Sequence, residues 1–375
     1  MKKYLLVILL ILGFESFGST LNVETKTFKN GRTIRVCLPE KYTKFTLKLP
    51  VIYVFDGQIL FNYIIGLYEY NFDKYPPAII VGIEQLDRGN EFIKQKEDSA
   101  KKTFYKFEDF ITKELIQYID SNYRTNSIKI GIGHSHGGTF LLNNLLLHKT
   151  FTVGICVSPT LWTNKYAIFQ NYQAIKNKSD LSFQLYLAYG ENDFSAIKKG
   201  VCDFNQMLLS DSTSKIISHV DEYKGEDHNS AILVGSRKGL NYIFKDYVFP
   251  ENKWDLMEES ANDSMFYTHY KKLSKKLNCQ IIPLEDDYNS LGYFYLELNK
   301  IDKAMEIFKK SMIYYPYSSN VYDSYADALE KKGELKKAYK FCQKALKLEL
   351  KTDNNSFQIE QYKGHLTKLE KALGK

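Results

Sequence analysis

The sequence predicts an α/β domain with a mostly parallel sheet, followed by an all-α region. Between about residue 20 and residue 250, short apolar runs alternate with helix-sized amphipathic spacers, which is the pattern of parallel strands joined by helical crossovers. Beyond residue 250 the strand-like runs stop and helical segments recur with a period of 34 residues. With 375 residues, 44% of them hydrophobic, the chain can form a core in both regions.

The first 19 residues predict an export signal. Lys2 and Lys3 precede an apolar run over residues 4–14, and small residues follow it. This order of basic, apolar and small residues is typical of a signal peptide, here with cleavage near residues 18–20. The apolar run is too short to span a bilayer. We therefore expect a periplasmic or secreted protein with no stable membrane span after signal removal.

Seven apolar runs predict the strands of the sheet. Each is rich in β-branched and aromatic residues, and several are apolar throughout, as in strands that are buried on both faces. Two amphipathic segments, residues 106–123 and 139–148, predict helices directly before and after the fourth strand. The predicted strands cover residues 33–38, 49–55, 78–83, 127–132, 151–157, 183–189 and 215–220.

The most informative motif is Gly-His-Ser-His-Gly-Gly at residues 133–138, between the fourth strand and its helix. A strand that ends in Gly-x-Ser-x-Gly and turns at once into a helix holds its serine in a tight bend. The flanking glycines allow strand and helix to approach closely. The motif and its context predict Ser135 as a nucleophile.

A nucleophilic serine needs a base, an acid that orients the base, and donors for the oxyanion. In a parallel sheet these groups gather at the carboxyl ends of the strands. The strand at 183–189 leads into Glu191 and Asp193. We predict Asp193 as the acid, because its position further into the loop allows the side chain to turn back, and Glu191 remains the alternative acid. His228 is the predicted base, because it follows the last strand in a polar loop.

The oxyanion donors are predicted to be backbone N–H groups. The tight elbow directs the side chains of His134 and His136 away from the serine, but the N–H of His136 faces the reacting carbonyl. The second donor is expected in the loop after the strand at 49–55, where Gly57 permits a close approach and the N–H of Gln58 follows.

Four ordered blocks carry a family resemblance: Val-Ile-Tyr-Val-Phe-Asp-Gly at 51–57, Ile-Ile-Val-Gly-Ile at 79–83 with Arg88 after it, the motif at 133–138, and Gly-Glu-Asp-His-Asn-Ser at 225–230. Together they resemble the putative esterase family, which includes esterase D, feruloyl esterase domains and enterochelin-type siderophore esterases. The resemblance covers roughly residues 30–250. It implies an α/β-hydrolase fold and carboxylic ester hydrolysis through Ser135 and His228.

The C-terminal region resembles tetratricopeptide repeats. At an offset of 34 residues, Tyr288 pairs with Tyr322, and Gly292 pairs with Ala326, so large and small positions recur in register. Two repeats cannot bury their faces alone, and we expect helices at 255–277 and 357–373 to supply the missing contacts. The predicted segments are a signal peptide (1–19), the α/β-hydrolase domain (20–250), a helical connector (251–285), two repeats (286–350) and a capping helix (351–375).

Composition excludes several other classes of protein. The net charge of +7 comes from scattered lysines on helix-like surfaces, which argues against nucleic-acid binding. Five dispersed cysteines show no Cys-x-x-Cys spacing, so neither a metal site nor a cofactor is predicted.

The expected partners are a small-molecule or glycan ester substrate and a protein or peptide on the repeats. The sequence does not distinguish a siderophore trilactone from an acetylated or feruloylated glycan or a small acyl ester. Two other readings stay open: a noncatalytic hydrolase fold that binds a ligand, and an interaction protein whose repeats carry the function.

Overall fold

The computed structural model describes residues 22–71, 74–94, 98–177, 181–352 and 354–374. The predicted export signal lies outside the described residues. Within them, no helix is both long enough and apolar enough to cross a membrane.

The centre of the molecule is an eight-stranded sheet in the order β1-β2-β4-β3-β5-β6-β7-β8. Neighbouring strands from β4 to β8 are parallel, whereas β1 and β2 are antiparallel at one edge. The predicted fold class and all seven predicted strands are confirmed. The strands are β1 (Asn22–Thr27), β2 (Thr33–Leu38), β3 (Leu49–Val54), β4 (Ile79–Ile83), β5 (Thr125–His134), β6 (Val153–Val157), β7 (Gln184–Gly190) and β8 (Ile217–Tyr223).

Helices cover both faces of the sheet. On β6, a Cβ on Gly154 would lie 2.4 Å from Leu145 of α5, whereas the next residue, Ile155, lies against Gly239 of α8. Because successive strand residues point to opposite faces, α5 and α8 lie on opposite sides of the sheet. The helices of this domain are α1 (Gly57–Tyr70), α2 (Arg88–Phe92), α3 (Asp98–Asp109), α4 (Ile116–Asn122), α5 (His136–Leu147), α6 (Thr163–Ile175), α7 (Ser195–Ser210) and α8 (Ala231–Phe244).

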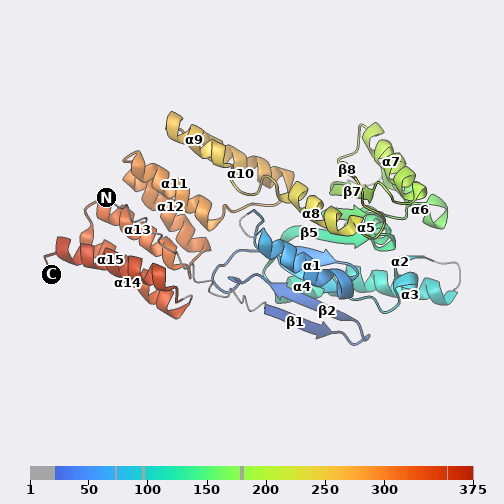
Figure 1. Ribbon diagram of the computed structural model, residues 1–375, viewed down its shortest axis with the longest axis horizontal. Coiled ribbons are helices and arrows are strands. Elements are labelled where there is room, and N and C mark those ends of the chain that lie inside the picture. The colour runs from blue at the N-terminus through green and yellow to red at the C-terminus, as the bar shows by residue number, and fades with distance from the viewer. Residues whose placement is uncertain (1–21, 72–73, 95–97, 178–180, 353, 375) are drawn as a thin grey trace, which may run out of the picture.

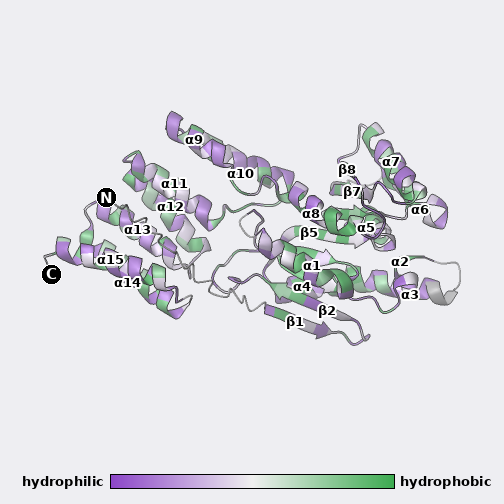
Figure 2. Ribbon diagram, viewed as in Figure 1, coloured by the Kyte–Doolittle hydropathy of each residue, from purple (hydrophilic) through white to green (hydrophobic). Residues whose placement is uncertain are grey.

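The strands are buried because their sequences are apolar on both faces. Every residue of β3, β4, β6 and β7 is buried, and Figure 2 shows hydrophobic residues gathered in the helices that cover them, α1 and α5. Under α5, the rings of Phe55, Phe92, Phe107 and Phe140 pack against one another with centroids 5.0–6.4 Å apart. The helix predicted at 106–123 starts earlier, at Asp98, and passes through a π-helical turn (Phe110–Leu115) before α4.

The C-terminal region is all helical, as predicted. The segment predicted as one helix at 255–277 is two helices, because Ala261 adopts a left-handed backbone conformation with φ 50° between them. From α11 onward each helix packs on the next, and Gly292 of α11 admits the ring of Phe308 of α12, which fits the predicted repeat. The helices are α9 (Glu251–Ser260), α10 (Ser264–Lys276), α11 (Glu285–Glu297), α12 (Ile301–Tyr314), α13 (Ser319–Lys331), α14 (Leu335–Lys351) and α15 (Ser356–Ala372).

The two regions touch through backbone hydrogen bonds. Figure 1 shows an elongated molecule with the sheet at one end and helices α11–α15 at the other. The N–H of Thr46 donates to the carbonyl of Tyr314 at 3.0 Å, and the N–H of Tyr317 donates to the carbonyl of Lys44 at 3.3 Å. The helical array therefore packs against the α/β domain near the start of β3.

Candidate active site

Ser135 occupies a sharp turn between β5 and α5. Its backbone has φ 56° and ψ −121°, a conformation that costs free energy for any residue other than glycine. A Cβ on Gly133 would lie only 2.6 Å from the carbonyl oxygen of Gly137, so the turn can close only with glycine at that position. The predicted elbow is therefore present, with its serine at the carboxyl end of the sheet's central strand.

The structure brings His228 to Ser135. The two residues are 93 positions apart in the sequence, yet Nε2 of His228 lies 3.1 Å from Oγ of Ser135. His228 stands in the loop between β8 and α8, and its side chain is 20% exposed. A hydrogen bond of this length allows the imidazole to take the hydroxyl proton.

Asp193 lies on the other side of the imidazole. Its Oδ1 is 2.9 Å from Nδ1 of His228, and its side chain is fully buried. Oδ2 accepts a 2.5 Å hydrogen bond from Oγ of Ser158, and Oδ1 accepts another from the N–H of Phe194 at 2.8 Å. These contacts hold the ring with Nδ1 as donor to Asp193 and Nε2 as acceptor toward Ser135.

Glu191, the alternative acid, takes a different position. Its carboxylate accepts a hydrogen bond from the N–H of Gly225 at 2.9 Å, within the loop that carries His228. Its side chain supports that loop, and Asp193 is the carboxylate that contacts the imidazole.

The two histidines that flank the serine contact other groups. Nε2 of His134 donates to the backbone carbonyl of His228 at 2.7 Å, and burial lowers the pKa of His134 to about 4. Nδ1 of His136 lies 2.6 Å from Oγ1 of Thr160, and burial lowers the pKa of His136 as well. Both side chains are therefore held by hydrogen bonds, and that of His134 supports the loop of His228.

The predicted oxyanion donors stand in the first turns of two helices. Gln58 is the second residue of α1 and His136 is the first residue of α5, where backbone N–H groups have no partner within the helix. Such N–H groups can stabilise the negative oxygen of a tetrahedral intermediate.

An ion pair ties the loop of Gln58 to the serine elbow. Asp56, at the end of β3, has a left-handed backbone with φ 55°. The guanidinium of Arg88 donates to both carboxylate oxygens of Asp56 at 2.7 and 2.9 Å, and reaches the carbonyl of His134 at 3.4 Å. The two segments that carry the predicted donors are thus connected by one side chain.

Sequence reasoning assigned no role to three supporting residues. Ser158 donates to Asp193, Thr160 contacts His136, and Arg88, named above only as part of a family block, joins two loops. Ser158 directly follows β6, so its position at a carboxyl strand end was a usable signal. The partner of Arg88 could not be read from the sequence, since Asp56 is 32 residues away.

One large apolar side chain lies exposed beside His228. The ring of Phe194 is 64% exposed, and its centroid is 5.3 Å from that of His228. A phenylalanine left in solvent next to reactive groups can form an apolar contact for a bound molecule.

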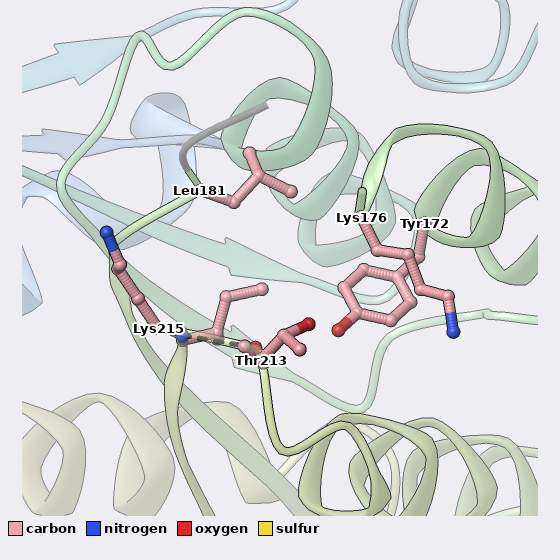
Figure 3. A pocket seen from close by; sticks show the side chains of 7 residues that line it. Tyr172, Lys176, Leu181, Thr213 and Lys215 are labelled. Atoms are coloured by element: carbon pink, nitrogen blue, oxygen red, sulfur yellow. Dashed lines mark hydrogen bonds between the residues drawn. The ribbon is translucent and has the colours of Figure 1, made fainter. Parts of the chain in front are cut away.

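The small cavity of about 40 Å³ in Figure 3 is separate from this site. Tyr172 of α6 lines it together with Leu181, which precedes β7, and Lys215, which precedes β8. These residues stand at the amino ends of the strands, the opposite end from Ser135, so the cavity plays no part in the arrangement described above.

Comparison with known proteins gives a family and a fold. Residues 25–199 match the family described as Putative esterase. None of the curated proteins matches the chain. Among solved structures, an IroE-like serine hydrolase from Shewanella oneidensis is similar at 21% identity with a TM-score of 0.63, over 74% of this chain and 95% of that one.

Two further structures are similar over different spans. An uncharacterised protein from Capnocytophaga ochracea is 20% identical with a TM-score of 0.63, over 93% of this chain and 99% of that one. Siderophore hydrolase EstB from Aspergillus nidulans is 19% identical with a TM-score of 0.52, over 61% of this chain and 95% of that one. At these identities the similarity establishes the fold.

Proposed function

Because residues 25–199 match the putative esterase family and the chain is a carboxylic ester hydrolase, we propose that it cleaves esters through Ser135, His228 and Asp193. The observation that carries the proposal is the continuous pair of hydrogen bonds, 3.1 Å from Ser135 to His228 and 2.9 Å from His228 to Asp193. This is the arrangement that nucleophilic serine hydrolysis requires.

The first half of the reaction forms an acyl-enzyme. Oγ of Ser135 attacks the ester carbonyl carbon while Nε2 of His228 takes its proton, and Asp193 stabilises the imidazolium. The backbone N–H groups of Gln58 and His136 hold the oxyanion. The intermediate then collapses, and the C–O bond to the alcohol breaks as His228 returns the proton to the leaving oxygen.

The second half releases the acid. A water molecule attacks the acyl carbon of acyl-Ser135, and His228 takes a proton from that water. Collapse of the second tetrahedral intermediate breaks the bond to Oγ of Ser135, which regains its proton from His228. The sum is one ester and one water converted to an acid and an alcohol.

The test of this proposal is turnover of p-nitrophenyl acetate by the purified protein. Ser135→Ala should lower kcat/KM by about 10³-fold or more, because the nucleophile is lost. Ser210→Ala, which removes the hydroxyl of a serine that donates to the carbonyl of Met207, is the matched control and should retain wild-type turnover. Equal rates for Ser135→Ala and the wild type would contradict the proposal and favour a noncatalytic ligand-binding protein.

For the substrate, we propose an ester whose acyl part carries an aromatic ring. The exposed ring of Phe194 beside His228 supports this choice, since aromatic rings pack favourably against one another. Catecholate siderophores and feruloylated glycans both offer such a group, and two of the similar structures are described as siderophore hydrolases.

The substrate proposal is tested by comparing esters that differ in their acyl group. Phe194→Ala should lower kcat/KM for methyl ferulate and for a catecholate siderophore about 10-fold more than for p-nitrophenyl acetate. An equal loss for all three esters would contradict an aromatic acyl site. The kcat/KM values of the wild type for methyl ferulate and for the siderophore are then compared. The ester with the larger value indicates whether a feruloylated glycan or a siderophore is the substrate.

We propose export to the periplasm or beyond, which the pattern of residues 1–19 supports. We also propose that the helical array offers its surface to a peptide or protein partner, which its arrangement of consecutive helices supports.

A further inference from the structure

Three helices of the C-terminal array meet at a cluster of metal-ligating side chains, far from Ser135 in the sequence. Asp323, Asp327 and Glu330 follow one another on a single face of α13 at spacings of four and three residues. His365 of α15 faces them, and Cys342 of α14 lies beside them.

His365 is the centre of the cluster, and its two ring nitrogens differ. The side chain is only 10% exposed. Nδ1 lies 2.8 Å from Oδ1 of Asp323 and donates to it. Nε2 is buried and makes no hydrogen bond within the described residues, although Oε2 of Glu330 lies at 3.3 Å and Oδ1 of Asp327 at 3.5 Å.

The orientation of the ring directs Nε2 toward the two remaining carboxylates. Because Nδ1 donates to Asp323, Nε2 is the nitrogen that faces Asp327 and Glu330. Two carboxylates in a mostly buried space need a positive charge between them, and a metal ion that displaces the Nε2 proton can supply it.

We propose that His365, Asp327 and Glu330 bind a divalent transition-metal cation, for which zinc is the suitable probe. Zinc sits about 2.0–2.2 Å from nitrogen and carboxylate ligands in a tetrahedron, so its ligand atoms lie about 3.3–3.5 Å apart. The separations of 3.3 and 3.5 Å from Nε2 match those edges. Water would occupy the fourth position.

The residues around the three ligands fit this assignment. Asp323 acts as a positioning residue, as carboxylates commonly do behind a metal-bound histidine. The other oxygen of Asp327 accepts from the hydroxyl of Tyr293 at 2.6 Å. Lys368 contacts both oxygens of Glu330 at 2.8 and 3.0 Å from outside the cluster.

The thiol in the cluster is not a ligand in this assignment. Cys342 lies with Asp323 on the Nδ1 side of the ring, and its Sγ donates to the carbonyl of Tyr362 at 3.5 Å. Burial raises the pKa of the Cys342 thiol, whereas zinc binds the thiolate.

The bound cation would connect α15 to α13 and close the end of the array, independently of ester hydrolysis. The site could not be predicted from the sequence, because no short Cys or His motif marks it. Its ligands come from two helices, and the nearest two, Glu330 and His365, are 35 residues apart. The role is structural, since none of the three ligands lies in the α/β domain.

Zinc retention by the full-length protein tests the proposal. The protein is stripped with a chelator, incubated with zinc chloride and dialysed, and its metal content is measured by plasma mass spectrometry. We expect one zinc per wild-type chain, and a melting temperature several degrees higher with zinc than without, because binding to the folded state alone stabilises it.

Variants assign the zinc to this cluster. His365→Gln and Glu330→Gln should each retain less than about a tenth of the wild-type zinc, and Asp323→Asn should weaken binding about 10- to 100-fold. Lys363→Gln, which changes an exposed lysine of the same helix that contacts Glu360 and none of the proposed ligands, is the matched control and should retain one zinc per chain. If His365→Gln fails to fold, the zinc content of Glu330→Gln tests the assignment in its place.

Two results would overturn the assignment. One is a wild-type chain that retains no zinc after dialysis, and the other is Glu330→Gln or His365→Gln that folds and retains as much zinc as the wild type. Both are measured without reference to esterase activity, so failure of this proposal and failure of the proposed catalytic function are distinguishable.

Discussion

Asp193 accepts hydrogen bonds from a serine hydroxyl, a backbone N–H and the imidazole of His228, and water does not reach its side chain. Its carboxylate is therefore fixed in one orientation before any substrate arrives. Glu191, two residues earlier, lies away from the imidazole, because its backbone N–H donates to the carbonyl of Tyr223 at 2.8 Å.

This difference predicts the effect of neutralising each carboxylate. Asp193→Asn should lower kcat by about 10³- to 10⁴-fold, because an amide can hold the imidazole in the wrong tautomer. Glu191→Gln should stay within about 3-fold of the wild type, because it removes only the charge of a loop contact. Steady-state turnover of p-nitrophenyl acetate measures both, and the reverse order of losses would make Glu191 the acid.

His134 predicts a pH dependence of stability. Its folded pKa is about 4, below the ordinary value of about 6.5 for histidine, so between these values the unfolded chain binds a proton that the folded chain does not. The stabilising contribution is present above about pH 6.5 and is lost as the pH falls toward 4. From pH 7.5 to pH 5 the loss should be about 2 kcal/mol.

Urea unfolding at these two pH values measures the effect. His134→Gln keeps a side-chain N–H for the carbonyl of His228 but cannot titrate, so its free energy of unfolding should fall about 2 kcal/mol less than that of the wild type over this interval. An identical fall in both proteins would show that the proton is taken up elsewhere.

At the level of single residues, the sequence could predict those contacts that depend on the order of strands and on the position of a loop. The contact between Ser135 and His228 could be predicted because a motif marks the first and the order of strands restricts the second. The sequence favoured Asp193 over Glu191 but could not exclude Glu191, since both leave the same strand and only the turn geometry separates them. Ser158 and Arg88 were missed because their roles depend on contacts with distant segments.

At the level of elements, the junction of β5 and α5 depends on the absence of a side chain. Gly133→Ala would place a Cβ 2.6 Å from the backbone of Gly137, so the helix must move away from the strand. We expect a stability loss of about 1–3 kcal/mol and a fall in turnover of more than about 10-fold as the serine shifts.

Gly66→Ala in α1 is the matched substitution. A Cβ there meets no atom within 4 Å, and alanine favours helix over glycine by up to about 1 kcal/mol, so this variant should be as active as the wild type and no less stable. Thermal unfolding and p-nitrophenyl acetate turnover compare the two. A fully active Gly133→Ala would contradict the close approach.

Two elements departed from the sequence prediction for local reasons. The strand β1 was not predicted because all its residues are exposed, so its sequence has no apolar pattern and its pairing depends on β2. The break at Ala261 was not predicted because alanine is a strong helix former. The surrounding tertiary contacts, such as Tyr295 to Asp263, set the direction of α10 instead.

At the level of the whole molecule, the contact between the sheet domain and the array passes through Thr46. Its N–H donates to Tyr314 and its hydroxyl to Ile313, at 3.0 and 3.1 Å. Thr46→Pro removes both bonds and should destabilise the protein by about 1–2 kcal/mol, while Thr46→Val keeps the backbone bond and should lose less.

Calorimetry and turnover together check this prediction. Thr46 lies before β3, at the amino end of the strands, whereas Ser135 lies at the carboxyl end. Thr46→Pro should therefore lower the unfolding temperature and leave the turnover of p-nitrophenyl acetate unchanged at 25 °C. A loss of turnover without a change in unfolding temperature would contradict a purely structural contact.

The order of the strands has a consequence for how the enzyme becomes active. The strands β5, β6, β7 and β8 are neighbours in space in the same order in which they occur in the chain. The serine elbow lies at the first of them, whereas His228 follows the last. We expect activity to appear during refolding only when the loop after β8 docks on a sheet that is otherwise complete.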